Sequence, residues 1–153
     1  MLTKSQLAIQ LSRLLLFENP QIDKEQYPTD SEIAADLLWH AYMLGDIENK
    51  TIADLGAGTG ILGIGALLLD AKNLIFVDND QLALERLEEN LVAINITKKK
   101  YKIIHKDIND LLKKDLGLPE TAVLKASLHN LLIYEPGQFF EYHYIPLIYL
   151  ATG

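Results

Sequence analysis

No cysteine occurs in the chain. Without thiols, disulfide bonds and thiolate-bound metal sites are excluded, and a cytoplasmic location is favoured over an oxidising compartment. Long apolar runs are also missing, so we expect no segment that spans a bilayer. The first residues lack a basic stretch followed by an apolar one, which makes a secretory signal unexpected.

Positive charge is scarce as well. The chain has 14 Lys and Arg against 21 Asp and Glu, a net charge of −7. A protein that holds nucleic acid by charge alone is usually basic, so a strong stand-alone nucleic-acid binder is disfavoured. A local basic patch or a basic partner stays open; the one basic run, at 98–100, is interpreted as a solvated turn rather than an RNA contact. The four histidines have no metal-binding spacing, and no metal site is expected.

The 153 residues, 49% of them hydrophobic, are enough for one domain with its own core. We expect N-terminal helices in 1–45, a cofactor-binding Rossmann half in 46–128 and an aromatic-rich tail in 129–153. Strands and helices alternate along the middle of the chain. This alternation predicts an α/β fold with a Rossmann-like parallel sheet and flanking helices. The periodicity predicts helices over 2–18, 29–44, 60–69 and 81–94, and strands over 51–54, 74–77, 101–105 and 121–124.

The helical periodicity also predicts which side chains face the core. They are Leu7, Leu11, Leu14 and Leu15 in the first helix, Ile33, Leu37, Leu38 and Ala41 in the second, and Leu84, Leu87, Leu91 and Ile94 in the fourth. Thr29 to Glu32 has the spacing of a capping box, which would open the second helix. Gly45 is placed to end it.

A glycine loop, Asp54-Leu55-Gly56-Ala57-Gly58-Thr59-Gly60, follows the first predicted strand directly. It therefore lies at the carboxyl end of that strand, where open α/β sheets bind ligands. Gly56 and Gly58 allow a sharp turn and a close approach to a ligand. Gly60 opens the next helix, whose free N–H groups favour a negative group nearby.

Two further acids follow the next strands. Asp78 ends the second strand, where a carboxylate can accept both ribose hydroxyls of a nucleoside. Asp107 follows the third strand at the same edge, within reach of an adenine amine. Each has a local alternative, because Asp78 could cap the next helix and Asp107 could cap a short one.

The acid before the glycines, and their alternate spacing, set this loop apart from a dinucleotide fingerprint. Gly58-x-Gly60-x-x-Gly63 does match that fingerprint, but Gly63 falls inside the predicted helix. A nicotinamide-dependent oxidoreductase is therefore an alternative that a titration with NAD would decide.

The stretch from about 26 to 110 resembles the class I S-adenosylmethionine-dependent methyltransferases. More narrowly, it resembles the archaeal and eukaryotic ribosomal-RNA adenine methyltransferases, which modify the exocyclic amine. The resemblance implies S-adenosyl-L-methionine as cofactor and methyl transfer to an adenine amine in RNA. The matching pieces are Glu25–Thr29, Asp46–Lys50, Ala53–Gly60, Phe76–Asp80 and Lys106–Ile108.

The resemblance also implies a role for each candidate residue. Gln26 and Thr29 would line the methionine end of the cofactor, although the capping box explains Thr29 equally well. Asp78 would hold the ribose, and Asp107 with Ile108 would border the adenine. The middle of the cofactor would be wrapped by Gly56, Ala57, Gly58, Thr59, Gly60 and Ile61, and Asp54 before them is a further candidate cofactor-binding residue.

One family motif is absent. An Asn-Pro-Pro-Phe sequence ends the fourth strand in the family and binds the adenine that accepts the methyl group. This chain has Lys125 to Leu128 at the aligned place. A charged lysine cannot accept a hydrogen bond from an amine, and leucine has no π face to stack on a base. Catalytic residues therefore stay unknown. A non-catalytic protein-interaction module on the same scaffold is the alternative function.

Residues 129–153 are too few for the three further strands and two helices usual in the family. The sheet would then keep an exposed edge that invites pairing with another chain, such as a second copy or a small zinc-ribbon activator. The aromatic tail could instead cover the sheet with Phe139, Phe140, Tyr142, Tyr144 and Tyr149. A degenerate paralogue, a truncated or frame-shifted product and a partner-dependent module all fit this pattern.

Overall fold

The computed structural model describes residues 2–20, 28–108, 124–127, 130–133 and 148–149. Gln26, His129 and most of the predicted aromatic tail lie outside these ranges. Within them, no helix is both long and apolar enough to cross a bilayer.

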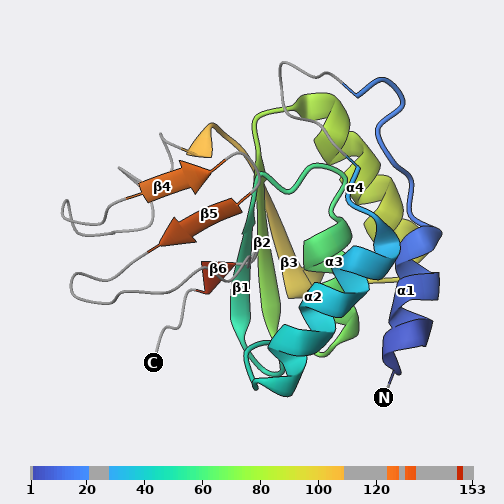
Figure 1. The fold of residues 1–153 in the computed structure, drawn as a ribbon. Helices are drawn as coiled ribbons and strands as arrows, with labels where there is room; N and C mark the ends of the chain where they lie inside the picture. The colour runs from blue at the N-terminus through green and yellow to red at the C-terminus, as the bar shows by residue number, and fades with distance from the viewer. Residues whose placement is uncertain (1, 21–27, 109–123, 128–129, 134–147, 150–153) are drawn as a thin grey trace.

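Three parallel strands form the centre of the main sheet (Figure 1). They are β1 (Thr51–Leu55), β2 (Asn73–Asp78) and β3 (Tyr101–His105), in the order β3-β2-β1. The predicted Rossmann-like parallel sheet is therefore confirmed. Because the strands are parallel, the residues after each one meet at a single edge of the sheet.

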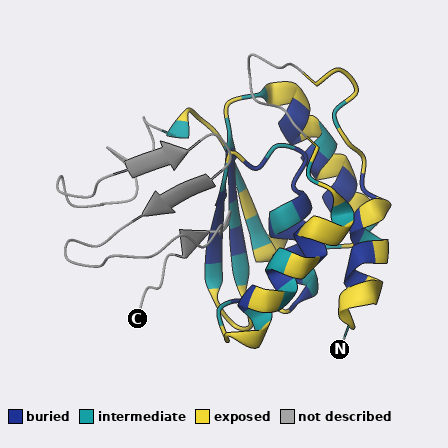
Figure 2. Ribbon diagram, in the orientation of Figure 1, coloured by how far each residue is buried: buried dark blue, intermediate teal, exposed yellow. Residues whose placement is uncertain are grey.

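The α-helices of the described residues lie on the same side of this sheet in Figure 1. They are α1 (Lys4–Ser12), α2 (Ser31–Met43), α3 (Ile61–Leu68) and α4 (Gln81–Ala93). α3 and α4 contact the strands, while α1 and α2 pack against each other and against α3. Figure 2 shows the result: buried and exposed residues alternate along the helices, whereas no residue of β1 or β2 is exposed.

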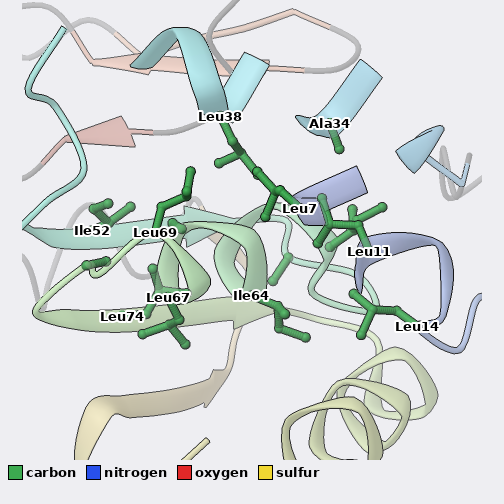
Figure 3. Close-up of a cluster of buried hydrophobic side chains, with 14 of the residues drawn as sticks. Leu7, Leu11, Leu14, Ala34, Leu38, Ile52, Ile64, Leu67, Leu69 and Leu74 are labelled. Carbon is green, nitrogen blue, oxygen red and sulfur yellow. The ribbon is translucent and has the colours of Figure 1, made fainter. Parts of the chain in front are cut away.

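The core lies between the helices and one face of the sheet (Figure 3). Alternate strand residues, Ile52 on β1 with Leu74 and Phe76 on β2, supply its floor. Small residues let the helices come close: a Cβ at Gly65 of α3 would overlap the side chain of Leu38 on α2. The buried side of α2 is correspondingly built from Ala34, Ala35, Leu38 and Ala41.

The C-terminal strands depart from the predicted pattern. Of the fourth strand expected over 121–124, only Leu124 is described, and it begins β4 (Leu124–Ser127). This strand pairs antiparallel with β5 (Asn130–Ile133) in a separate two-stranded sheet. β6 (Ile148–Tyr149) pairs antiparallel with β1 instead. Lys125 therefore lies within β4 and does not follow a strand as predicted, and the altered C-terminal strands that the sequence predicts are observed.

The first helix is shorter than predicted. α1 ends at Ser12, with Arg13 as its C-cap. Leu14 is still buried, but Leu15 is 43% exposed, so its predicted place in the core is wrong. The reason is that the chain leaves helical geometry before this position, which ends the 3.6-residue period.

The start of the second helix differs as well. Asp30 is the N-cap of α2, and its side chain accepts hydrogen bonds from the N–H groups of Glu32 and Ile33. The predicted capping box from Thr29 is therefore wrong. Ile33 is 58% exposed, because the alanine side of α2, not its isoleucine, faces α3. Leu37 is half-buried.

Candidate cofactor site

The glycine loop turns sharply between β1 and α3 and is tied to the neighbouring strand. The N–H groups of Gly56 and Ala57 both donate to the carbonyl oxygen of Val77, at 2.8 and 2.9 Å. Gly56 and Gly58 have φ values of 77° and 56°. This left-handed region favours glycine, which explains the alternate spacing seen in the sequence.

Asp78 joins the loop to the end of β2. Its Oδ2 atom accepts a hydrogen bond from the N–H of Gly58 at 2.8 Å, and Oδ1 accepts one from the N–H of Asp80 at 2.9 Å. Asp80 is the N-cap of α4: its side chain accepts hydrogen bonds from the N–H groups of Leu82 and Ala83 in the first turn. The capping alternative for Asp78 is therefore wrong, and its carboxylate stands directly against the loop.

Asp54 lies beneath the loop, with 3% of its surface exposed. Its Oδ2 atom accepts a hydrogen bond from the N–H of Gly63 at 2.9 Å, which ties the end of β1 to the first turn of α3. Burial is the main cause that raises the pKa of this carboxyl to about 7. The hydrogen bond from Gly63 opposes the rise, and the like charge of Asp78 adds to it by less.

The rest of the loop is buried against the core. Gly60 is the N-cap of α3 with φ at 92°, and a Cβ there would overlap the side chain of Leu87. Ala57, Thr59 and Ile61 are buried. A ligand at this loop would therefore meet mainly its backbone and the more accessible Gly56 and Gly58.

The residues after β3 come to the same edge. The N–H of Lys106 donates to the carbonyl oxygen of Asp78 at 3.0 Å. The Cδ1 atom of Ile108 lies 3.8 Å from the position that a Cβ would take at Gly56. Asp107, between them, is exposed. The structure thus brings the predicted ribose and adenine residues together around one end of the loop.

Thr29 is half-buried just before α2. Because Asp30 caps this helix, the local explanation for Thr29 falls away, and its ligand role stays a prediction. Among the described residues, no group of three or more His, Asp and Glu is placed to hold a metal ion.

Sequence reasoning missed two residues at the loop. Asn90, on the predicted apolar side of α4, is 1% exposed and donates a hydrogen bond to the carbonyl oxygen of Thr59 at 3.0 Å. Phe17 packs against Gly58, with its Cζ atom 3.0 Å from the position of a Cβ there. The sequence signal that could have found Asn90 is its polar side chain, at a position where the helical period predicts an apolar residue.

Known proteins resemble the chain over the same region. A family model described as ribosomal protein L11 methyltransferase (PrmA) matches residues 40–119, more than half of the chain. An uncharacterized protein of Methanocaldococcus jannaschii is 37% identical over 110 residues, which cover 72% of this chain and 49% of that protein. The rRNA N(6)-adenosine-methyltransferase METTL5 of Danio rerio is 45% identical over 76 residues, covering 49% of this chain and 37% of the relative.

A solved structure agrees with these matches. A Pyrococcus horikoshii protein described as an RNA methyltransferase superposes with a TM-score of 0.65 and 50% sequence identity, over 70% of this chain and 52% of that one. The chain spans about half or less of the length of these relatives. The loop, the parallel sheet and the matched family model together show that the chain belongs to the PrmA-type family of S-adenosylmethionine-dependent methyltransferases.

Proposed function

We propose that the chain binds S-adenosyl-L-methionine at the edge of the sheet where the glycine loop meets Asp78. The observation that carries this proposal is the hydrogen bond from Gly58 to the Asp78 carboxylate, which fixes an acceptor for a ribose beside an open glycine turn. Ile108 and Asp107 would border the adenine from the end of β3. Thr29, together with Gln26, would line the methionine end.

The charge of the site supports this cofactor over a dinucleotide. The sulfonium and ammonium groups of S-adenosylmethionine outweigh its one carboxylate, so the cofactor is cationic overall. Asp54 and Asp78 are close enough for the like charge of Asp78 to contribute to the raised pKa of Asp54. A cation relieves such repulsion, whereas the pyrophosphate of NAD would add to it.

We further propose that RNA carries the methyl acceptor, because the Danio rerio relative is named as an rRNA N(6)-adenosine-methyltransferase. Methyl transfer proceeds in line from sulfur to nitrogen, and its rate depends mainly on how donor and acceptor are positioned. The part assigned to this chain is to hold and orient the donor. The Asn-Pro-Pro-Phe motif is absent from the sequence, so no residue here is assigned to hold the methyl-accepting adenine of the RNA.

Calorimetric titration of the chain with S-adenosylhomocysteine and S-adenosylmethionine tests the cofactor proposal. We expect saturable binding that the variant Asp78→Asn weakens at least about tenfold, because a charged hydrogen-bond acceptor is lost. NAD should not bind. Binding of NAD alone would support an oxidoreductase, and no binding of any of the three at about millimolar concentration would favour the interaction module.

Transfer of a labelled methyl group to ribosomal RNA tests the acceptor. Incorporation that depends on the intact glycine loop would support an RNA substrate, and incorporation into protein alone would contradict it. The zinc-ribbon activator, self-association at a sheet edge and the cytoplasmic location stay predictions of the sequence. Co-purification, sedimentation and fractionation would test them.

A further inference from the structure

The segment 14–18, named here the N-terminal strap, lies outside the Rossmann half and contacts the glycine loop through Phe17. Figure 1 shows the chain leaving α1 and running beside α4. Leu14 anchors its beginning in the core, whereas the side chains of Leu15 and Leu16 are 43% and 47% exposed. Burial of these two side chains therefore does not explain why the strap lies where it does.

Main-chain hydrogen bonds to one buried side chain hold the strap instead. The Oδ1 atom of Asn90 accepts from the N–H of Leu15 at 2.7 Å, and its Nδ2 atom donates to the carbonyl oxygen of Leu15 at 3.0 Å. The second proton of Nδ2 goes to the carbonyl oxygen of Thr59 at 3.0 Å. One amide thus satisfies three backbone groups, two on the strap and one on the glycine loop.

The cost of placing an asparagine here argues that this junction has a purpose. The other buried residues of α4 are all apolar: Ala83, Leu84, Leu87 and Leu91. A polar side chain that is 1% exposed is tolerated only when its hydrogen bonds are made. A leucine at this position would continue the apolar side but would leave the strap and the loop unconnected.

The strap reaches the loop a second time through Phe17. Its ring packs against Gly58, the residue whose N–H donates to Asp78. Farther along, Glu18 forms an ion pair with Arg86 of α4. The strap is therefore fixed on both sides of Phe17. Gly58 packs against the strap itself, and Thr59 is bonded to the same asparagine of α4 that holds the strap.

We propose that Asn90 is a positioning residue for the cofactor and that the strap it holds places Phe17 as an outer support of the glycine loop. This inference rests on the proposed binding of S-adenosylmethionine. In physical terms, the strap restricts the motion of the loop before the cofactor arrives, so less conformational entropy is lost on binding.

Two variants test the proposal, each with two readouts. Asn90→Asp keeps the size and the acceptor for Leu15 but loses both Nδ2 donations, including the one to the loop. Phe17→Ala removes the half-buried ring and leaves the hydrogen bonds of Asn90 in place. Leu16→Ala is the matched control, because it lies on the same strap and its side chain is exposed.

The first readout is the affinity for S-adenosylhomocysteine, measured by calorimetry below the melting temperature of each variant. We expect Phe17→Ala to weaken binding about fivefold to tenfold and Asn90→Asp at least about tenfold. The second readout is amide exchange of Gly58 without cofactor, which should become about tenfold faster in both variants. Leu16→Ala should match the wild-type chain in both.

The two readouts separate this inference from the proposed function. If the wild-type chain does not bind the cofactor, the proposed function fails, and amide exchange alone still decides whether the strap holds the loop. If Phe17→Ala keeps wild-type exchange at Gly58, or Asn90→Asp keeps both wild-type exchange and affinity, the inference is overturned. Should Asn90→Asp fail to fold, the exchange and affinity of Phe17→Ala decide between support and refutation.

Discussion

The buried carboxyl of Asp54 should make the stability of the chain depend on pH. Its pKa is about 7 in the folded state against 3.8 for an ordinary aspartate. Between these values the folded state keeps a proton that the unfolded state has released. The free energy of unfolding therefore falls as pH rises through this window, and the loss is complete once pH exceeds the folded pKa.

The size of the effect follows from the two pKa values. From about pH 5 to about pH 8, this group alone should lower the free energy of unfolding by about 2–3 kcal/mol. Asp54→Asn keeps an oxygen that can accept the hydrogen bond from Gly63 but cannot ionise. Urea denaturation at several pH values, followed by circular dichroism, should therefore show a smaller decline for the variant than for the wild-type chain.

The difference between the two pH profiles is the quantity to measure, because titration of groups distant from Asp54 is common to both proteins and cancels. Asp70→Asn is a matched control: Asp70 is exposed, and asparagine tolerates its positive φ of 64°. Its profile should follow the wild-type profile. Parallel profiles for Asp54→Asn and the wild-type chain would mean that Asp54 ionises normally in the folded state, and the reasoning would be refuted.

Three further predictions concern packing, capping and the loop. Leu38→Ala should lower the free energy of unfolding by about 2–5 kcal/mol, because it empties a fully buried position, while Ile33→Ala on the same helix should change it by no more than about 0.5 kcal/mol. Asp30→Ala should cost about 1 kcal/mol in thermal unfolding through loss of the α2 cap, whereas Thr29→Ala should leave stability unchanged and weaken cofactor binding several-fold. Gly60→Ala should destabilise the chain by more than about 1 kcal/mol and abolish calorimetric binding of S-adenosylhomocysteine, because its Cβ would overlap α4.

Each of these predictions has an outcome that contradicts it. Equal losses for Leu38→Ala and Ile33→Ala would mean that α2 does not pack on its alanine side. A loss of stability in Thr29→Ala as large as in Asp30→Ala would restore Thr29 as the cap. Normal cofactor binding by Gly60→Ala would remove the glycine loop from the proposed site.

Local patterns were enough to predict the centre of the fold. The alternation of strands and helices between Thr51 and His105 follows from short apolar runs, periodic leucines and the glycines between them, all read within a few residues of sequence. The position of Asp78 beside the loop also followed, because parallel strands bring their carboxyl ends together.

Contacts between distant segments could not be predicted in this way. Leu15 and Asn90 are 75 positions apart, and nothing near either residue indicates the other. At the start of α2, Thr29 and Asp30 are adjacent and both favour N-cap positions, so one residue of register decided between them. The pairing of β6 with β1 likewise depends on segments nearly one hundred residues apart.

The order of the main sheet also bears on how the chain folds. β1, β2 and β3 are consecutive in the sequence and adjacent in space, and each connection between them holds one α-helix. These pairings close shorter loops than the pairing of β1 with β6 does, so they cost less closure entropy. During synthesis, residues 51–105 could therefore acquire their sheet and the glycine turn before the β6 residues leave the ribosome, and the antiparallel partner of β1 would join a structure that already exists.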